Sequence, residues 1–173
     1  MFSLPLSAQD APKAGNDALD AMYVQLLSAP ASEARRIGEE IRHVLSISGS
    51  PTMNFLLKRG RSAMERGDLD MAIHHLTALT DHAPGFAEGW HARSVAYARA
   101  GLMGPALSDL ERALTLEPRN FAAIYSLAAL LEQVEQPDLA YEAYTRVLDI
   151  HPHFDDVSAA LERLSAEVGG ADL

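Results

Sequence analysis

Apolar residues recur at helical spacing along most of the chain, in short runs separated by glycine or proline. Between residues 86 and 116 the apolar positions fall three and four apart, with a break at Gly101. Such spacing places the apolar side chains on one face of a helix, and a glycine just past the last turn commonly ends one. The pattern predicts two helices, 86–100 and 103–116, joined by a short turn.

Two sets of residues recur with a period of 34 along the chain. The prolines are Pro84, Pro118 and Pro152, and the alanines are Ala72, Ala106 and Ala140. A period of this length is typical of stacked helical repeats, in which each unit buries its apolar face against the next one. We therefore expect tandem helix pairs, with each proline ending the second helix of its pair.

The middle unit carries further markers when Ala87 is taken as its first position. Trp90, Tyr97, Gly101, Ala106 and Pro118 then fall at positions 4, 11, 15, 20 and 32. This arrangement resembles the tetratricopeptide repeat (TPR), and the resemblance covers 53–86 (TPR 1), 87–120 (TPR 2) and 121–154 (TPR 3).

The units depart from the repeat pattern at two places. Arg93 and Ser94 replace a Leu-Gly pair, and Glu135 replaces the turn glycine found as Gly67 and Gly101. Small residues are kept where the two helices of a unit should cross, because larger ones would overpack the contact. Three aromatic residues at helical spacing are predicted to fill the core: Trp90, Tyr97 and Tyr144.

The repeat resemblance and the flanking segments together predict an all-α fold. It is an α-solenoid of three tandem TPR helix hairpins with an N-terminal helical pair and a C-terminal capping helix. The pair, within 16–50, begins at Asn16 and ends at Pro51, and we interpret it as a degenerate repeat or a cap. The capping helix, 155–168, has apolar residues on one side and charges on the other.

Residues 1–15 begin with an apolar stretch that ends in small residues at Ala8. This resembles the end of a secretory signal peptide, although the cationic start of a complete one is missing. One reading is export to the periplasm with cleavage after Ala8; the other is a disordered cytoplasmic N-terminus. The whole chain also resembles small exported alphaproteobacterial TPR proteins, a group that implies no defined activity.

Charge and composition exclude several function classes. Twenty-four acidic and fourteen basic side chains give a formal net charge of −10, which repels nucleic-acid phosphates. The chain has no cysteine, and no stretch approaches the roughly 18 apolar residues of a membrane span. We expect no nucleic-acid partner and no membrane-spanning segment.

Candidate catalytic and metal-binding residues form no recognised pattern. His74 and His75 are neighbours on a helix and point in different directions, and His151 and His153 lie in a turn. The chain has no His-Glu-x-x-His and no Gly-x-Ser-x-Gly sequence. The sequence therefore predicts no enzyme, no cofactor and no metal site, and histidine-based hydrolysis or metal chemistry is the weakest alternative.

The resemblance implies a concave wall formed by the first helix of each unit, where partners bind. The corresponding residues are Asn54, Leu57, Arg61, Glu65, Glu88, His91, Val95, Arg99, Tyr125 and Glu132. The Lys/Asn/Arg set with which some family members grip a terminal carboxylate is not reproduced, since His91, Ala92 and Ala122 occupy its places. We predict a scaffold that binds a protein or peptide partner, and the alternative is a self-associating homodimer.

Overall fold

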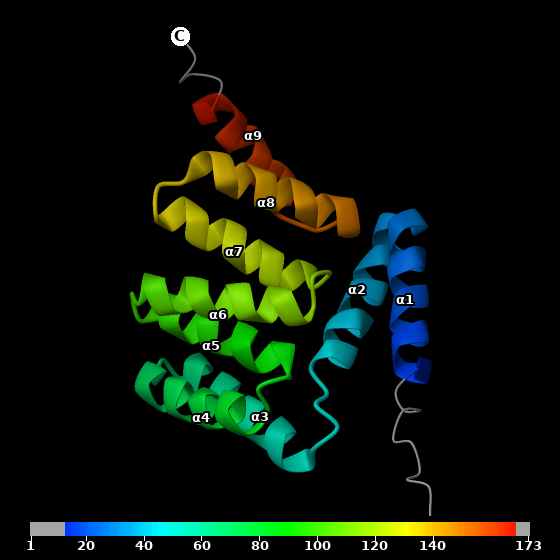
Figure 1. Cartoon of the computed structure of the whole chain (residues 1–173). Helices are drawn as coiled ribbons and strands as arrows, with labels where there is room; N and C mark the ends of the chain where they lie inside the picture. The colour runs from blue at the N-terminus through cyan, green and yellow to red at the C-terminus, as the bar shows by residue number, and fades with distance from the viewer. Residues whose placement is uncertain (1–12, 169–173) are drawn as a thin grey trace, which may run out of the picture.

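The computed structural model describes residues 13–168, and in this part of the chain there are nine α-helices and no strand. The helices are α1 (Lys13–Ser28), α2 (Ala31–Leu45), α3 (Pro51–Glu65), α4 (Leu69–His82), α5 (Ala87–Arg99), α6 (Met103–Leu116), α7 (Phe121–Gln133), α8 (Pro137–Ile150) and α9 (Val157–Val168). Helices α3 to α8 stack as three antiparallel pairs, and α9 covers the end of the stack (Figure 1). The all-α solenoid of three tandem hairpins is confirmed.

Small residues lie at the crossing of the two helices in each unit, as the 34-residue register predicts. The side chains of Ala72, Ala106 and Ala140 are fully buried. The crossing of α3 and α4 is too close for a side chain at Gly60, because a Cβ atom added there would lie 2.5 Å from the side chain of Leu76. This position requires glycine, since α4 cannot retreat without losing the packing of Leu76.

The turn inside each unit ends the first helix with one residue in the left-handed conformation. Its φ is 76° at Gly67, 78° at Gly101 and 57° at Glu135. The glutamate therefore takes the backbone conformation of the glycines that it replaces, at a cost of about 1 kcal/mol. The geometry of the hairpin is thus kept in all three units.

The substitution of the Leu-Gly pair in the middle unit is explained by a buried ion pair. The guanidinium of Arg93 donates two hydrogen bonds to the carboxylate of Asp109 on α6, at 2.7 and 2.9 Å, and one to Thr80 at 2.8 Å. It also lies 4.9 Å from the ring centre of Trp90. Trp90 is partly exposed and donates to the carbonyl of Pro84, so its prediction as a core residue is wrong.

The N-terminal helical pair does not stack on α3 and α4 as a further repeat would. Helices α1 and α2 lie beside the stack and pack onto the third unit (Figure 1). Leu26 and Ile41 share one buried core with Phe121 on α7. The hydroxyl of Tyr23 donates to the carbonyl of Arg119 at 2.9 Å. The pair thereby covers the side of the third unit, where the chain passes from α6 into α7.

A close contact between α2 and the α8–α9 loop fixes this arrangement. A Cβ atom added at Gly38 would lie 2.7 Å from Nε2 of His151, which is 4% exposed. The Nδ1 atom of His151 is buried without a hydrogen-bond partner, and burial lowers the pKa of this imidazole. Arg35 on α2 adds an exposed ion pair with Asp155 at 3.3 Å.

The ends of two helices differ from the sequence prediction. α1 begins at Lys13, before the predicted start at Asn16. Pro51 opens α3 instead of closing the preceding helix, because proline lacks the N–H that a first helical residue leaves unpaired anyway. Residues 1–12, which contain most of the predicted signal segment, lie outside the described residues.

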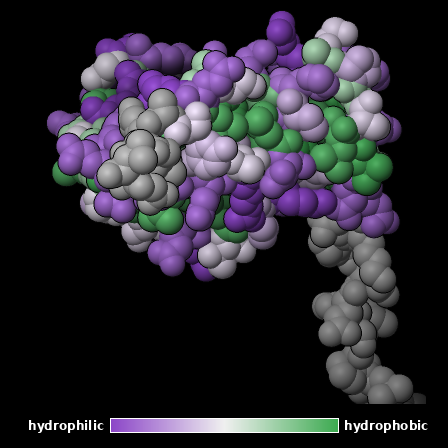
Figure 2. Space-filling model, turned by 90° about the horizontal axis from the view of Figure 1, so that it is seen from above, coloured by the Kyte–Doolittle hydropathy of each residue, from purple (hydrophilic) through white to green (hydrophobic). Residues whose placement is uncertain are grey.

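The C-terminal helix α9 turns its apolar side towards α8, with Val157 and Leu164 buried. The surface seen from above is largely hydrophilic, with hydrophobic residues gathered in the middle and towards the N-terminal helices (Figure 2). None of the described helices is both long and apolar enough to span a membrane.

Candidate partner-binding groove

The predicted concave residues lie on α3, α5 and α7, but most of them are already engaged within the chain. Leu57 is 3% exposed and belongs to the core between α3, α4 and α5. The Oδ1 atom of Asn54 accepts hydrogen bonds from the backbone N and hydroxyl of Ser48, at 2.8 and 2.7 Å. Asn54 therefore fixes the link between α2 and α3, and of the four predicted wall residues on α3 only Arg61 and Glu65 remain outside these contacts.

A polar chain crosses the concave wall from α3 through α5 to α7. Arg61 donates to one carboxylate oxygen of Glu88, and the other oxygen lies 3.3 Å from Nδ1 of His91. Nε2 of His91 is 3.0 Å from the hydroxyl of Ser126 on α7. Three of the predicted residues are thus brought together with a fourth that sequence reasoning missed.

The central carboxylate of this chain, that of Glu88, is 7% exposed. Burial raises its pKa, but His91 and Arg61 outweigh that effect, so the pKa lies below its usual value of 4.5. A buried carboxylate is stable only when its charge is paired and its lone pairs accept hydrogen bonds. Arg61 and His91 meet both conditions here, and Glu88 is ionised at neutral pH.

Glu132, at the far end of the predicted wall, bonds to the capping helix. Its carboxylate accepts hydrogen bonds from the hydroxyl of Tyr144 at 2.7 Å and from Arg163 on α9. The hydrogen bond from Arg163 is the main cause that lowers the pKa of Glu132. Glu132 therefore joins α7, α8 and α9.

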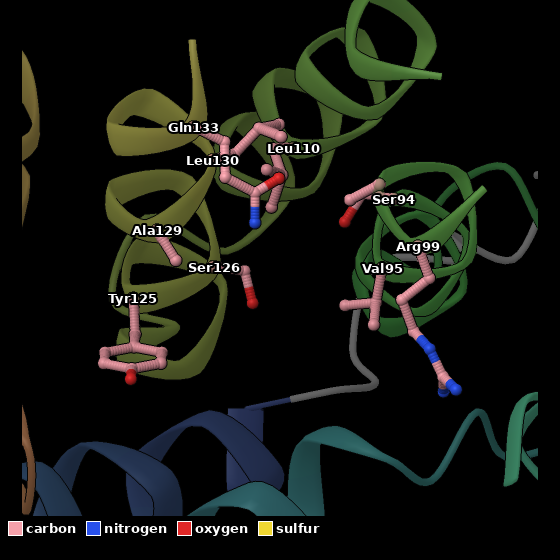
Figure 3. A pocket seen from close by; sticks show the side chains of 10 residues that line it. Ser94, Val95, Arg99, Leu110, Tyr125, Ser126, Ala129, Leu130 and Gln133 are labelled. Atoms are coloured by element: carbon pink, nitrogen blue, oxygen red, sulfur yellow. The ribbon is translucent and has the colours of Figure 1, made fainter. Parts of the chain in front are cut away.

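Three predicted residues, Val95, Arg99 and Tyr125, line a groove between α5 and α7 that encloses about 230 Å³. The remaining lining residues are Ser94, Ala98, Leu110, Ser126, Ala129, Leu130 and Gln133. Figure 3 shows the guanidinium of Arg99 directed outward at the rim, and the side-chain amide of Gln133 directed into the groove. The floor is apolar and the rim is polar, an arrangement common to sites that bind apolar groups.

Arg99 is the cation that this groove presents to solvent. It is exposed, and within residues 13–168 its guanidinium has no ion-pair partner. Its neighbours across the groove, Tyr125 and Ala129, carry no charge. A carboxylate that enters the groove would therefore meet an unneutralised guanidinium.

Among the lining residues that were not predicted, Ser126 and Gln133 are the polar ones on α7. Both lie on the side of α7 that faces α5 once the two helices are stacked. The repeat register could therefore have identified them as groove residues. No group of three or more histidine, aspartate and glutamate side chains in the described part of the chain is placed to hold a metal ion.

The fold and the groove can be compared with known proteins. No family model matches the chain. It is 30% identical over 165 residues to a TPR repeat-containing protein of Rhizobium etli, an alignment that covers 95% of this chain and 79% of that protein.

Two solved structures share the fold. The first TPR domain of Spaghetti (RPAP3), bound to the HSP90 peptide SRMEEVD, matches with a TM-score of 0.66 and 24% identity, over 69% of this chain and 95% of that one. MamA matches with a TM-score of 0.64 and 21% identity, over 94% of this chain and 87% of that one. Since the Rhizobium etli protein aligns with nearly the whole chain, and the three stacked helix pairs repeat every 34 residues, the chain belongs to the TPR repeat-containing proteins.

Proposed function

We propose that the protein is a scaffold that binds a partner protein through a short peptide or helix in the groove between α5 and α7. The observation that carries this proposal is the groove itself, with an apolar floor and the unpaired Arg99 at its rim. The solved TPR domain of Spaghetti holds a peptide, SRMEEVD, which supports peptide binding as a use of the same fold.

The groove is matched to a single apolar side chain of a ligand and a nearby carboxylate. Its volume of about 230 Å³ admits one large apolar side chain between Val95 and Leu130. The net charge of −10 opposes an acidic ligand at long range, but at physiological salt this field is screened beyond about 8 Å. A carboxylate in contact with Arg99 is closer than that distance, so the attraction of this guanidinium outweighs the repulsion by the net charge.

The proposal is tested by selecting peptides from a random display library and measuring their affinity by fluorescence anisotropy. Val95→Asp places a charge in the apolar floor and should weaken a selected peptide by about 10-fold or more, equivalent to about 1.4 kcal/mol. Lys58→Glu, at an exposed position on the other side of α3, makes a larger charge change away from the groove and should have little effect.

The charge requirement is tested on the same peptides. Arg99→Glu should weaken those that carry a carboxylate beside the apolar residue, and this loss should shrink as salt is raised. Equal affinities for the wild type, Val95→Asp and Arg99→Glu would place binding outside the groove. Light scattering at the same concentrations shows whether a second copy of the chain is the ligand instead.

A further inference from the structure

The polar chain across the concave wall places a serine, a histidine and a glutamate in a row at the groove. The hydroxyl of Ser126 is 3.0 Å from Nε2 of His91, and Nδ1 of His91 is 3.3 Å from a carboxylate oxygen of Glu88. These are the contacts of a nucleophile with its base, and of the base with the group that orients it. We propose that Ser126, His91 and Glu88 form a hydrolytic site that cleaves esters of short apolar acyl groups.

The environment of Glu88 sets the proton positions that this chemistry needs. Its ionised carboxylate can only accept, so the Nδ1 atom of His91 must carry a proton and donate it. In a neutral imidazole the Nε2 atom then has a free lone pair, directed at Ser126. Arg61 holds the other oxygen of the carboxylate, which keeps Glu88 from turning away.

The hydroxyl of Ser126 has two acceptors within reach. It lies 3.0 Å from the carbonyl of Ala122, one turn earlier on α7, and at the same distance from His91. A serine hydroxyl rotates freely between such partners. Transfer of the proton to His91 requires only this rotation, with no change in the backbone of α7.

The groove provides a place for the acyl group next to the nucleophile. Leu110 and Leu130 line it together with Ser126, and this apolar surface excludes charged acyl chains. The backbone N–H groups of α7 around Ser126 are used within the helix and cannot stabilise an oxyanion. The amide of Gln133, directed into the groove in Figure 3 and two turns further along α7 than Ser126, is the side-chain donor that we assign to that role.

The reaction follows two balanced steps. The oxygen of Ser126 attacks the ester carbonyl and gives its proton to Nε2 of His91; the bond to the leaving alcohol breaks, and the alcohol takes that proton. The acyl group now sits on Ser126. Water then attacks the acyl carbonyl, His91 accepts a proton from the water and returns it to Ser126, and the carboxylic acid is released.

With one side-chain oxyanion donor, we expect slow turnover that is limited to activated esters. General base catalysis contributes about 10²- to 10⁴-fold, and loss of an oxyanion donor costs about 10²- to 10³-fold. Ser126 and His91 are the catalytic residues of this proposal. Glu88 is a positioning residue, because it acts through His91.

The test measures hydrolysis of p-nitrophenyl butyrate at pH 7.5 by the full chain, with a fluorophosphonate probe as a second measurement. The wild type should exceed buffer and Ser126→Ala by at least about 10²-fold. Ser108→Ala, an exposed serine on α6, should retain the full rate. The probe should label Ser126, located by mass spectrometry of tryptic peptides, and no label should appear in Ser126→Ala.

Glu88→Gln tests the positioning role separately from stability. It should lower kcat, leave KM unchanged and alter the pH profile of kcat, which a merely structural role would not do. If Ser126→Ala keeps the wild-type rate and the label falls elsewhere, the hydrolytic site is refuted. The peptide-binding proposal is independent: a wild-type chain that binds selected peptides but hydrolyses no faster than buffer overturns this inference and leaves the scaffold function intact.

Discussion

The docking of the N-terminal helices onto the third unit can be tested by one methyl group. Gly38 lies in the middle of α2, where glycine is the poorest residue for a helix after proline. A Cβ atom at this position would lie 2.7 Å from Nε2 and 3.1 Å from Cδ2 of His151, and 3.7 Å from the ring of Phe121. His151 is buried and cannot swing into solvent, so Gly38→Ala must push α2 away from the third unit.

Two opposing effects set the size of the change. Alanine gains about 1 kcal/mol over glycine in a helix interior, whereas overpacking of a buried contact costs about 1–3 kcal/mol. We expect a net loss of about 1–2 kcal/mol. Gly104→Ala is the matched control: Gly104 also lies in a helix, α6, but a Cβ atom there meets nothing within 4 Å. Because Gly104 is the second residue of α6, this change should stabilise the protein slightly, by less than the ~1 kcal/mol of a helix interior.

The assay combines urea denaturation with hydrogen exchange. Denaturation gives the sign of each change, and exchange shows where it acts, because local opening exposes only the amides of the affected helices. Gly38→Ala should increase exchange in α1 and α2 while α3 to α6 stay protected. If Gly38→Ala is as stable as Gly104→Ala, α2 does not lie on His151 and the arrangement described above is wrong.

Three further changes probe other parts of the fold. Arg93→Met leaves the carboxylate of Asp109 buried and unpaired and should destabilise by about 3–5 kcal/mol in thermal unfolding, whereas Arg36→Ala, in exposed ion pairs, should cost below about 1 kcal/mol. Burial lowers the pKa of His151 below 6.5, so the neutral imidazole contributes its full stabilisation above pH 6.5, and this stabilisation is lost as the pH falls below that value. Denaturation at pH 7 and pH 5 should show this decrease in the free energy of unfolding in the wild type and not in His151→Leu. Glu135→Gly removes the left-handed strain at a turn and should raise stability by about 0.5–1 kcal/mol; an unchanged melting temperature would contradict the strain.

The repeat architecture follows from the sequence because its determinants are local or periodic. Ala72 and its two equivalents and the three prolines recur every 34 residues, and the turn glycine recurs in the first two units, so one register assigns them all. The same register placed Val95, Arg99 and Tyr125 on the wall that the groove occupies. Contacts between neighbouring units are made by residues that recur with the units, so the sequence pattern predicts these contacts.

The contacts that the sequence did not reveal are those that break the period. The N-terminal helices have the amphipathic pattern of a repeat, but that pattern states only that an apolar face is buried, not which surface covers it. Gly38 and His151 are far apart in the sequence and belong to no motif. Arg93 was visible as a departure from the repeat, yet its partner Asp109 becomes identifiable only when α5 and α6 are placed side by side.

Some residues of the concave wall pair within the chain and others line the groove, because partly buried charges need partners. Unpaired cations and carboxylates in a shallow groove would lose their hydration each time a ligand binds, which costs free energy. Arg61, Glu88 and Glu132 avoid this cost because they are paired within the chain. That pairing occupies most of the charged side chains of the predicted wall, whereas Val95 and Tyr125 line the groove between α5 and α7. Arg99 is the exception, since it is exposed at the rim and has no ion-pair partner among the described residues. If the groove between α5 and α7 is the binding site that we propose, lengthening a selected peptide towards α3 should add little affinity, because Arg61 and Glu88 are already paired there.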